Sequence, residues 1–385
     1  MSRWHETGTL SIVHLPARPA IISRGRHFIE AVVTIRSATQ DFERWLQRQT
    51  PIVRSDLRHK HAAMKSDPFS FLRATYYRWA QQFAELESTI SGAPKTLAVG
   101  DLHLENFGTW RDELGRLAWG INDFDEAYPL PYTHDLVRLA ASAMLAIGQN
   151  RLRLKLKTAC TAIIEGYREG LKCRGRAFVI GDYHRWFKPI LSDPPRDPGR
   201  FWDHLKSLPR ESAAVSSQAK AAIKQLLPEP GLRLDIRHRI AGLGNLGKPR
   251  HTALAEWNGG PIAREVKVLT LSAAAWACAA SDGPYYAQIL SGAVRSADPF
   301  LIVHKNWIVR RLAPDSRRIE LASLIRVKDE EWLLHAMGFE TANVHLGTPA
   351  SRRPILAHLQ KQSKGWLRKA ATAMHAMVMK DFVAW

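Results

Sequence analysis

Two segments stand out in this chain: Leu97-Ala98-Val99-Gly100-Asp101-Leu102-His103-Leu104-Glu105-Asn106-Phe107-Gly108, and Ile121-Asn122-Asp123-Phe124-Asp125-Glu126-Ala127. In the first, an apolar run enters a Gly-Asp turn, and Asn106 follows five residues after Asp101. In the second, another apolar run ends at Asp123. This spacing is typical of phosphoryl-transfer sites, where one carboxylate meets the acceptor hydroxyl while an amide oxygen and a second carboxylate hold magnesium.

The roles of these side chains follow from the preferences of the metal. Magnesium prefers hard oxygen ligands and usually takes only one or two carboxylates from a protein. Asn106 and Asp123 are therefore the candidate metal ligands, with Asp125 as a further candidate, and Asp101 is left as the base. The alternative is structural, because Gly-Asp turns are common and Asp and Asn cap helices in ordinary proteins. For Asp101 alone we would favour structure; the combined spacing favours a site.

The same residues resemble known kinases. Gly-Asp-Leu-His-x-x-Asn followed by Ile-x-Asp-Phe resembles the catalytic core of the aminoglycoside phosphotransferase and choline kinase group, within the protein-kinase-like fold. More closely, Gly-Asp-x-His-Leu-x-Asn-Phe-Gly, Asn-Asp-Phe-Asp-Glu and Asp-Leu-x-Arg-Leu-Ala-Ala-Ser resemble an uncharacterised bacterial family, a domain of unknown function. This likeness runs over most of the chain from about Met64 onward.

The resemblance implies specific roles. Asp101 takes the position of the catalytic base, and Asn106 and Asp123 take the metal positions. His103 is a supporting residue of the motif, and an Asp at the position of Asp135 holds the catalytic-loop backbone in the resembling families. One departure is Val99, which stands where many kinases have a His that supports the backbone.

Length and composition limit the class of protein. With 385 residues and 45% hydrophobic residues, the chain can bury a large core in two or three domains. Its three cysteines are far apart and lack metal-ligand spacing, which fits a reducing compartment and offers no zinc site. We expect no membrane span and a cytoplasmic location.

The formal charge of +19 indicates anionic partners in general. Nucleic acid, lipid headgroups and phosphorylated substrates would all fit, but the basic residues are scattered along the sequence, so composition alone is an equally good explanation. Any affinity for nucleic acid should be weak, electrostatic and unspecific, because no recognised reader motif is present.

Local patterns predict the elements around the motif. Arg54 to Lys65, which includes Lys60, is basic and polar and should be an exposed connection. Pro68 should open one helix that carries buried aromatics as far as Phe83. Thr109 to Trp119 should form a β-hairpin, and helices should follow from Thr133 and from Leu152. A loop at Pro129 to Pro131 and an irregular stretch from Lys172 to Gly231 are also expected.

A glycine-rich segment later in the chain supplies the candidate nucleotide-binding residues. Gly242, Gly244 and Gly247 follow an alternating strand pattern at Leu234 to Ile240. A dinucleotide-binding fold would need a helix directly afterwards, but two further strand patterns follow, Thr252 to Trp257 and Ile262 to Leu269, joined by a turn at Asn258-Gly259-Gly260.

Strand, glycine-rich turn, strand, hairpin and strand with an inward lysine is the order found over kinase phosphates, so Lys267 would neutralise phosphate. The alternative is a solvated strand lysine, although its apolar neighbours favour burial, where an unpaired Lys is costly. Kinases pair this Lys with an acid on the next helix, but Leu271 to Ala280 contains none. Glu265 or Glu320 could substitute.

The order of these segments predicts an α+β, two-lobed protein-kinase-like fold that is circularly permuted, with a small antiparallel β lobe and a larger helical lobe. We expect an N-terminal extension (1–66), a helical catalytic lobe (67–231), a glycine-rich nucleotide lobe (232–315) and C-terminal helices that return to the catalytic lobe (316–385). The strand from Trp307 to Leu312 would connect the lobes.

The expected function is an ATP- and magnesium-dependent phosphotransferase that acts on a hydroxyl of an unidentified acceptor. Nucleotidyl transfer, in which AMP is transferred instead, could use the same residues. The alternative that is not an enzyme is a non-catalytic nucleotide sensor or a basic nucleic-acid-binding protein. The absence of an acid from Leu271 to Ala280 and the net positive charge of the chain favour this alternative.

Overall fold

The computed structural model describes residues 33–87, 90, 92–180, 197–211, 215–318, 321, 324 and 326–385, so half of the expected N-terminal extension lies outside it. Thr34–Trp385 forms one compact unit, and the following description applies to that unit. It combines α-helices with small antiparallel sheets, which confirms the α+β class. No helix among the described residues is long and apolar enough to cross a membrane.

Among the described residues, the helices α1 (Ile35–Gln47), α2 (Arg54–Met64), α3 (Pro68–Ala74) and α4 (Tyr76–Glu87) precede the first motif segment. The expectation of an exposed connection at Arg54 to Lys65 is wrong, because this stretch is α2 and buries Asp56 and Lys60. These polar residues can be buried because each has a partner from a distant part of the chain. Asp56 Oδ1 lies 2.9 Å from His238 Nε2, and the Lys60 amine donates to the carbonyl of Gly244.

The helix expected from Pro68 is two helices. Asp67 caps α3 by accepting from the Ser70 N–H, and Pro68 occupies the first turn, as the sequence indicates. Helix α3 ends at Ala74, and Thr75 separates it from α4. The Thr75 hydroxyl donates to the carbonyl of Phe71. The aromatic and aliphatic side chains on these helices are core residues, as expected: Phe69, Leu72, Tyr76, Trp79 and Phe83.

Short strands carry the two motif segments. Strand β1 (Lys95–Ala98) pairs antiparallel with β4 (Tyr128–Pro131), so the expected loop at 129–131 is instead a strand. Strands β2 (Phe107–Arg111) and β3 (Leu117–Ile121) form the expected hairpin, and β5 (Phe178–Val179) adds to β3. The β1–β4 pairing and the β2–β3 hairpin bring the ends of both motif segments together.

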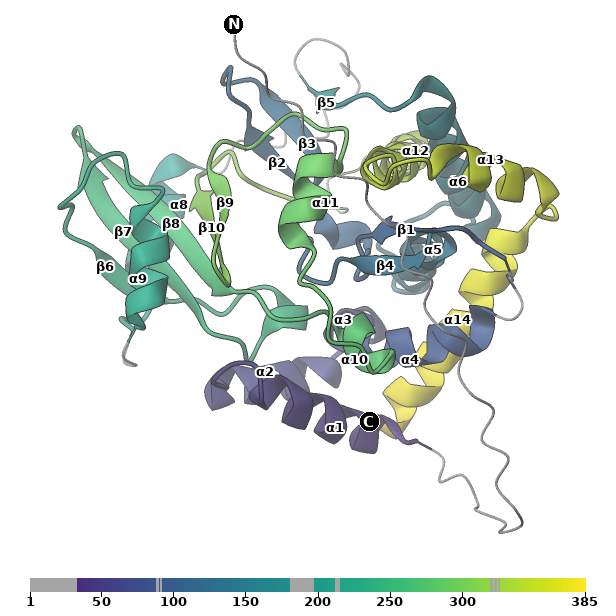
Figure 1. Ribbon diagram of the computed structural model, residues 1–385, viewed down its shortest axis with the longest axis horizontal. Helices are drawn as coiled ribbons and strands as arrows, with labels where there is room; N and C mark the ends of the chain where they lie inside the picture. Colours follow the sequence, from purple (N-terminus) through teal and green to yellow (C-terminus); the bar gives the residue numbers. More distant parts are fainter. Residues whose placement is uncertain are drawn as a thin grey trace, which may run out of the picture. The chain divides into compact units, whose positions relative to one another are not determined.

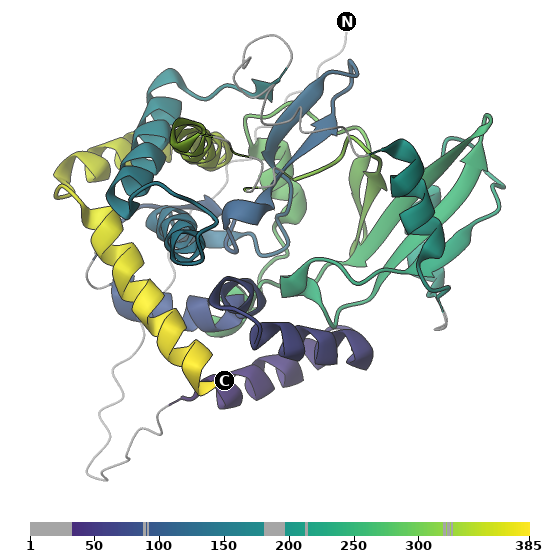
Figure 2. The ribbon, with the colours of Figure 1, turned by 180° about the vertical axis from the view of Figure 1, so that it is seen from behind.

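Long helices surround these strands. They are α5 (Thr133–Gly148), α6 (Leu156–Cys173), α12 (Val327–His345), α13 (Arg352–Lys361) and α14 (Trp366–Ala384). Helix α12 packs on α6, and α14 packs on α5 (Figures 1 and 2). The C-terminal segment therefore packs on α5 and α6, which follow the two motif segments.

A five-stranded antiparallel sheet contains the glycine-rich segment. Its order is β6-β7-β8-β10-β9, made of Asp235–His238, Arg250–Trp257, Gly260–Val268, Trp307–Leu312 and Leu301–His304. The expected turn joins β7 to β8, with Asn258 and Gly259 both at positive φ, which suits a tight hairpin turn. Short helices α10 (Ala273–Ala277) and α11 (Tyr286–Gly292) follow β8.

The described residues of the stretch expected to be irregular include the helices α8 (Pro198–Ser207) and α9 (Ser217–Lys224). Asp197 and Ser216 cap them, and α9 buries Ala219, Ala222 and Ile223. Helix α9 packs on strands β8 and β10 (Figure 1). The composition of this stretch does not predict α9. The helix is stabilised by the tertiary burial of a few small residues rather than by a strong periodic pattern in the sequence.

Candidate active site

The turn after β1 is held by a buried carboxylate. Asp135, in the first turn of α5, accepts from the Val99 N–H at 2.7 Å and from the Gly100 N–H at 2.9 Å, and its Oδ2 lies 3.0 Å from His345 Nε2. Although burial opposes ionisation, the neighbouring His134 and His345 hold the pKa of Asp135 well below its usual range. Asp135 thus holds the backbone that leads into Asp101.

Gly100 is required at this turn for two reasons. Its φ of +83° favours glycine, and a Cβ there would lie 2.2 Å from the carbonyl oxygen of Glu126. The second motif segment therefore passes directly over the first.

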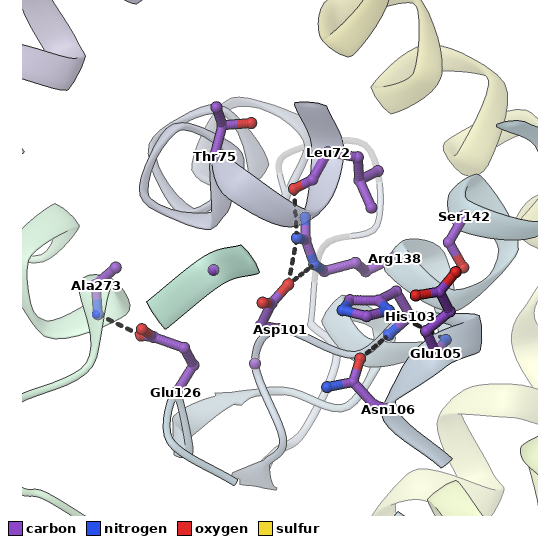
Figure 3. A network of polar contacts seen from close by, with 12 residues as sticks. Leu72, Thr75, Asp101, His103, Glu105, Asn106, Glu126, Arg138, Ser142 and Ala273 are labelled. Carbon is purple, nitrogen blue, oxygen red and sulfur yellow. Dashed lines mark hydrogen bonds and ion pairs between the residues drawn. The ribbon is translucent and has the colours of Figure 1, made fainter. Parts of the chain in front are cut away.

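Asp101 is paired with Arg138, a fully buried residue of α5 (Figure 3). Arg138 Nε donates to Asp101 Oδ1 at 2.9 Å, and its Nη2 donates to the same oxygen and to the Leu72 carbonyl. The guanidinium also lies over the rings of Tyr76 and Trp79, at 5.0 and 4.9 Å from their centroids. Burial, only partly offset by Arg138, raises the pKa of Asp101 to about 7.

Arg138 was not among the expected site residues. The signal was present, because Arg138 is the Arg of the quoted Asp-Leu-x-Arg motif, three residues after Asp135 on the same helix. That spacing places both side chains on one face of α5, where one holds the turn and the other holds its carboxylate.

Asn106 and His103 form a local cap. Asn106 Oδ1 accepts from the His103 N–H at 2.9 Å, and His103 Nδ1 accepts from the Glu105 N–H at 3.2 Å, around the 3-10 helix η2 (Leu104–Asn106; Figure 3). Burial lowers the pKa of His103 well below its usual value, so its ring is neutral. The amide oxygen of Asn106 keeps one lone pair for a further ligand, and its metal role stays a prediction.

Lys267 of β8 meets the second motif segment. Its Nζ lies 3.0 Å from Asp123 Oδ1 and 2.7 Å from Asp125 Oδ1. The lysine is 4% exposed, so the alternative of a solvated strand lysine is wrong. Residues more than 140 positions apart thus meet within ion-pair distance.

These contacts also explain the helix without an acid. Lys267 finds its carboxylates in Asp123 and Asp125, while the N-terminus of α10 is held by Glu126, whose Oε2 accepts from the Ala273 N–H (Figure 3). Glu265, one of the two suggested partners, instead forms ion pairs with Arg239, Arg250 and Arg310. Glu320 lies outside the described residues.

The two carboxylates beside Lys267 differ in their ionisation. Burial and the charge of Asp123 raise the pKa of Asp125 to about 6. Against the effect of burial, Lys267 holds the pKa of Asp123 below its usual range. The buried carboxylate of Asp125 lies 2.7 Å from Lys267 Nζ and close to the carboxylate of Asp123. A buried carboxylate with spare acceptors next to a partly exposed one fits a divalent cation.

Such a cation would need ligands from elsewhere. Among the residues that the structure describes, no three His, Cys, Asp or Glu side chains gather into a metal-binding group. Asp123 and Asp125 offer two carboxylates, which is the number that magnesium usually takes when phosphates supply the remaining oxygens. The donor set therefore fits magnesium bound together with a phosphorylated ligand.

The glycine-rich segment lies against Asp101. A Cβ on Gly244 would lie 3.2 Å from Asp101 Oδ2 and 3.0 Å from the Arg73 carbonyl, so a larger residue would need these neighbours to shift. Gly242 and Gly247, at the two ends, have φ of +69° and +99°. Helix α2 holds the segment from outside, because the Lys60 amine donates to the Gly244 carbonyl at 3.0 Å and the Val53 N–H donates to the Gly247 carbonyl at 2.9 Å.

Lys60 gives a stability prediction. Burial, followed by the charge of Lys248, lowers the pKa of Lys60 to about 8. A lysine whose folded-state pKa is depressed adds stability as the pH rises from the folded value towards the unfolded one. We expect the unfolding free energy of the wild-type protein to rise, relative to Lys60→Met, by about 1 to 2 kcal/mol between pH 8 and 9.5. Urea denaturation at both pH values measures this, with exposed Lys369→Met as the control; parallel behaviour of Lys60→Met and wild type would contradict it.

A cavity of about 710 Å³ is lined in part by Asn122, the residue before Asp123. It is lined by the β2 residues Thr109 and Trp110, by strands β9 and β10, and by 316–318, which crosses from β10 to β2. The crossing segment is anchored where the Thr109 N–H donates to the Arg317 carbonyl at 2.9 Å. This volume falls in the range of small-molecule sites.

Comparison with models of known protein families gives a match over part of the chain. A family model described as "Uncharacterized protein conserved in bacteria (DUF2252)" matches residues 52–177. The matched part runs from α2 through α6 and includes Asp101, Asn106, Asp123 and Asp135, whereas Lys267 and the glycine-rich segment lie beyond it. No curated protein and no solved structure showed a significant match.

Proposed function

We propose that this protein is an ATP- and magnesium-dependent phosphotransferase with a circularly permuted kinase-like fold. The observation that carries the proposal is the meeting of Lys267 with Asp123 and Asp125. A lysine that already shares a site with two potential metal ligands is placed to contact phosphates that bind the same metal.

Each residue has a role in this proposal. Asp101 accepts the proton of the acceptor hydroxyl, and Arg138 and Asp135 position it. Asp123 and Asp125, with Asn106, hold magnesium, which when bound neutralises charge on the transferring phosphoryl group. Lys267 binds phosphate oxygens, and Gly244 gives the backbone close access to the site.

The order of elements supports the permutation. The catalytic turn at Asp101 precedes the antiparallel sheet with Lys267, yet Lys267 and the acids after β3 lie in contact. The chain then leaves β10 through 316–318 and ends in α12 to α14, which pack on α5 and α6. This is the order that a kinase-like fold would show if it began within its helical lobe.

Product analysis tests the function. Incubation with magnesium and ATP should release ADP, with or without transfer to an added acceptor, and the rate should rise with pH through about 7 as Asp101 loses its proton. Asp101→Asn should remove this release. Formation of pyrophosphate instead of ADP would identify nucleotidyl transfer, and a magnesium-dependent thermal shift by ATP without any turnover would identify a nucleotide sensor.

A further inference from the structure

The 710 Å³ cavity next to Asn122 is lined by arginines that come from distant parts of the chain. Seven of its lining residues are arginines, against two acids, Glu105 and Asp298. Strands and the segments next to them supply Arg239, Arg310 and Arg311, the crossing segment supplies Arg317 and Arg318, and Arg151 and Arg295 complete the lining. Basic residues that are scattered in sequence are therefore concentrated at one place in the fold.

Two carboxylates, Glu265 and Glu105, each form ion pairs with three arginines. Two of the three arginines in each group line the cavity. Glu265, fully buried, is paired with Arg239, Arg250 and Arg310 at 2.6 to 2.8 Å. Glu105 is likewise paired with Arg73, Arg151 and Arg318 at 2.7 to 2.9 Å. One negative charge cannot neutralise three guanidinium groups, so each cluster keeps an excess of positive charge.

The excess charge faces the cavity, and like charges lie close together at Arg239 and Arg318. Burial, together with the neighbouring Arg310 and Arg250, lowers the pKa of Arg239, and burial, together with Arg73, lowers that of Arg318. Several guanidinium groups that lie close together at a partly buried site cost free energy unless a counterion is bound. Guanidinium groups bind phosphate oxygens through two parallel hydrogen bonds, and this geometry suits several of them around one anion.

We propose that this cavity binds the phosphate groups of a small polyphosphorylated ligand, which supply the negative charge that its own carboxylates do not. Leu301, Leu312 and Leu321 add an apolar side to the lining, so a nucleotide with several phosphates fits both parts of the cavity. The choice of a nucleotide rests on the proposed function; the binding of polyphosphate does not.

Inorganic tripolyphosphate in EDTA-containing buffer tests the inference without metal or turnover. Arg311 and Arg318 are the residues to change, because they come from different segments and neither holds Glu265. Calorimetry should detect binding to the wild-type protein, and Arg311→Gln with Arg318→Gln should weaken it by about tenfold or more. The corresponding Lys double variant should retain an intermediate affinity, because Lys keeps the charge but not the bidentate geometry.

A matched control separates the cavity from the general charge of the protein. Arg48 and Arg353 are exposed arginines outside the cavity lining, and Arg48→Gln with Arg353→Gln removes the same charge. This control should leave the affinity within about twofold of wild type. No binding of tripolyphosphate, or equal weakening in both double variants, would overturn the inference.

The experiments distinguish a failure of the proposed phosphotransferase function from a failure of the polyphosphate inference. Asp123→Asn should keep magnesium-free tripolyphosphate binding, because Asp123 is a carboxylate and contributes nothing attractive to an anion. If tripolyphosphate binds at the arginines but ATP gives neither ADP nor pyrophosphate, the inference stands and the phosphotransferase proposal does not. If ADP is released but tripolyphosphate does not bind, the reverse holds.

Discussion

Asp123→Asn and Asp101→Asn should each lower turnover of ATP by about 10³-fold, but for different reasons. Asp123 contacts Lys267 and belongs to the proposed metal site, so its variant should also bind magnesium–ATP at least about tenfold more weakly. Asp101 faces Gly244 and Arg138 and is assigned to the acceptor side. Its variant should bind magnesium–ATP as the wild-type protein does.

Titration of magnesium–ATP into both variants decides the assignment. Because Asp101→Asn removes the carboxylate that pairs with the buried Arg138, thermal melting is needed first to show that this variant is folded. Asp203→Asn, an exposed acid on α8, is the control for general loss of negative charge. Equal loss of binding in Asp101→Asn and Asp123→Asn would show that base and metal ligand have been assigned wrongly.

Asp135→Asn should lower the unfolding free energy by about 3 to 5 kcal/mol at pH 7. The carboxylate accepts two backbone N–H groups and contacts His345, all in a fully buried place. An amide has only one acceptor oxygen, and its NH₂ group would face one of these donors. Urea denaturation measures the loss, with Glu165→Gln on the exposed face of α6 as the control.

The pH dependence gives this prediction a second readout. The folded-state pKa of Asp135 is depressed, so its stabilising contribution is present above the unfolded pKa of about 4 and is lost as the pH falls below it. Between pH 5 and pH 3 the wild-type protein should therefore lose more stability than Asp135→Asn. A loss below about 1 kcal/mol at pH 7, or parallel acid denaturation curves, would contradict a structural role for the carboxylate.

Local chemistry made part of the site predictable. The hairpin of β2 and β3 and the turn at Asn258 and Gly259 follow from residues that tolerate tight turns between apolar strands. Gly100 and Asp135 were also recognisable, since a turn that needs positive φ and an acid at a helix start have sequence signatures. The aromatics of α3 and α4 were core residues, as their spacing indicated, although the break at Thr75 was not foreseen.

For other features, polarity alone wrongly predicts exposure. The helix α2 looked like a solvated connection, yet Lys60 and Asp56 are buried, since each meets a partner from 182 to 184 residues further along the chain. Arg138 was visible in a motif, but its role depended on where Asp101 lies. Glu265 looked like a partner for Lys267 because it is two residues away on one strand, whereas three arginines surround it.

The sequence by itself determined the residue types, the spacing of Asp101, Asn106 and Asp123, and the turns that present them, because these depend on neighbours within a few positions. Only the tertiary structure decided which charges meet. It placed Lys267 on Asp123 and Asp125, closed Gly244 over Asp101, and gathered scattered arginines around one cavity. The physical reason is that an ion pair acts over a few ångströms of space and carries no signature in sequence separation, so its partners are chosen by how the helices and sheets pack.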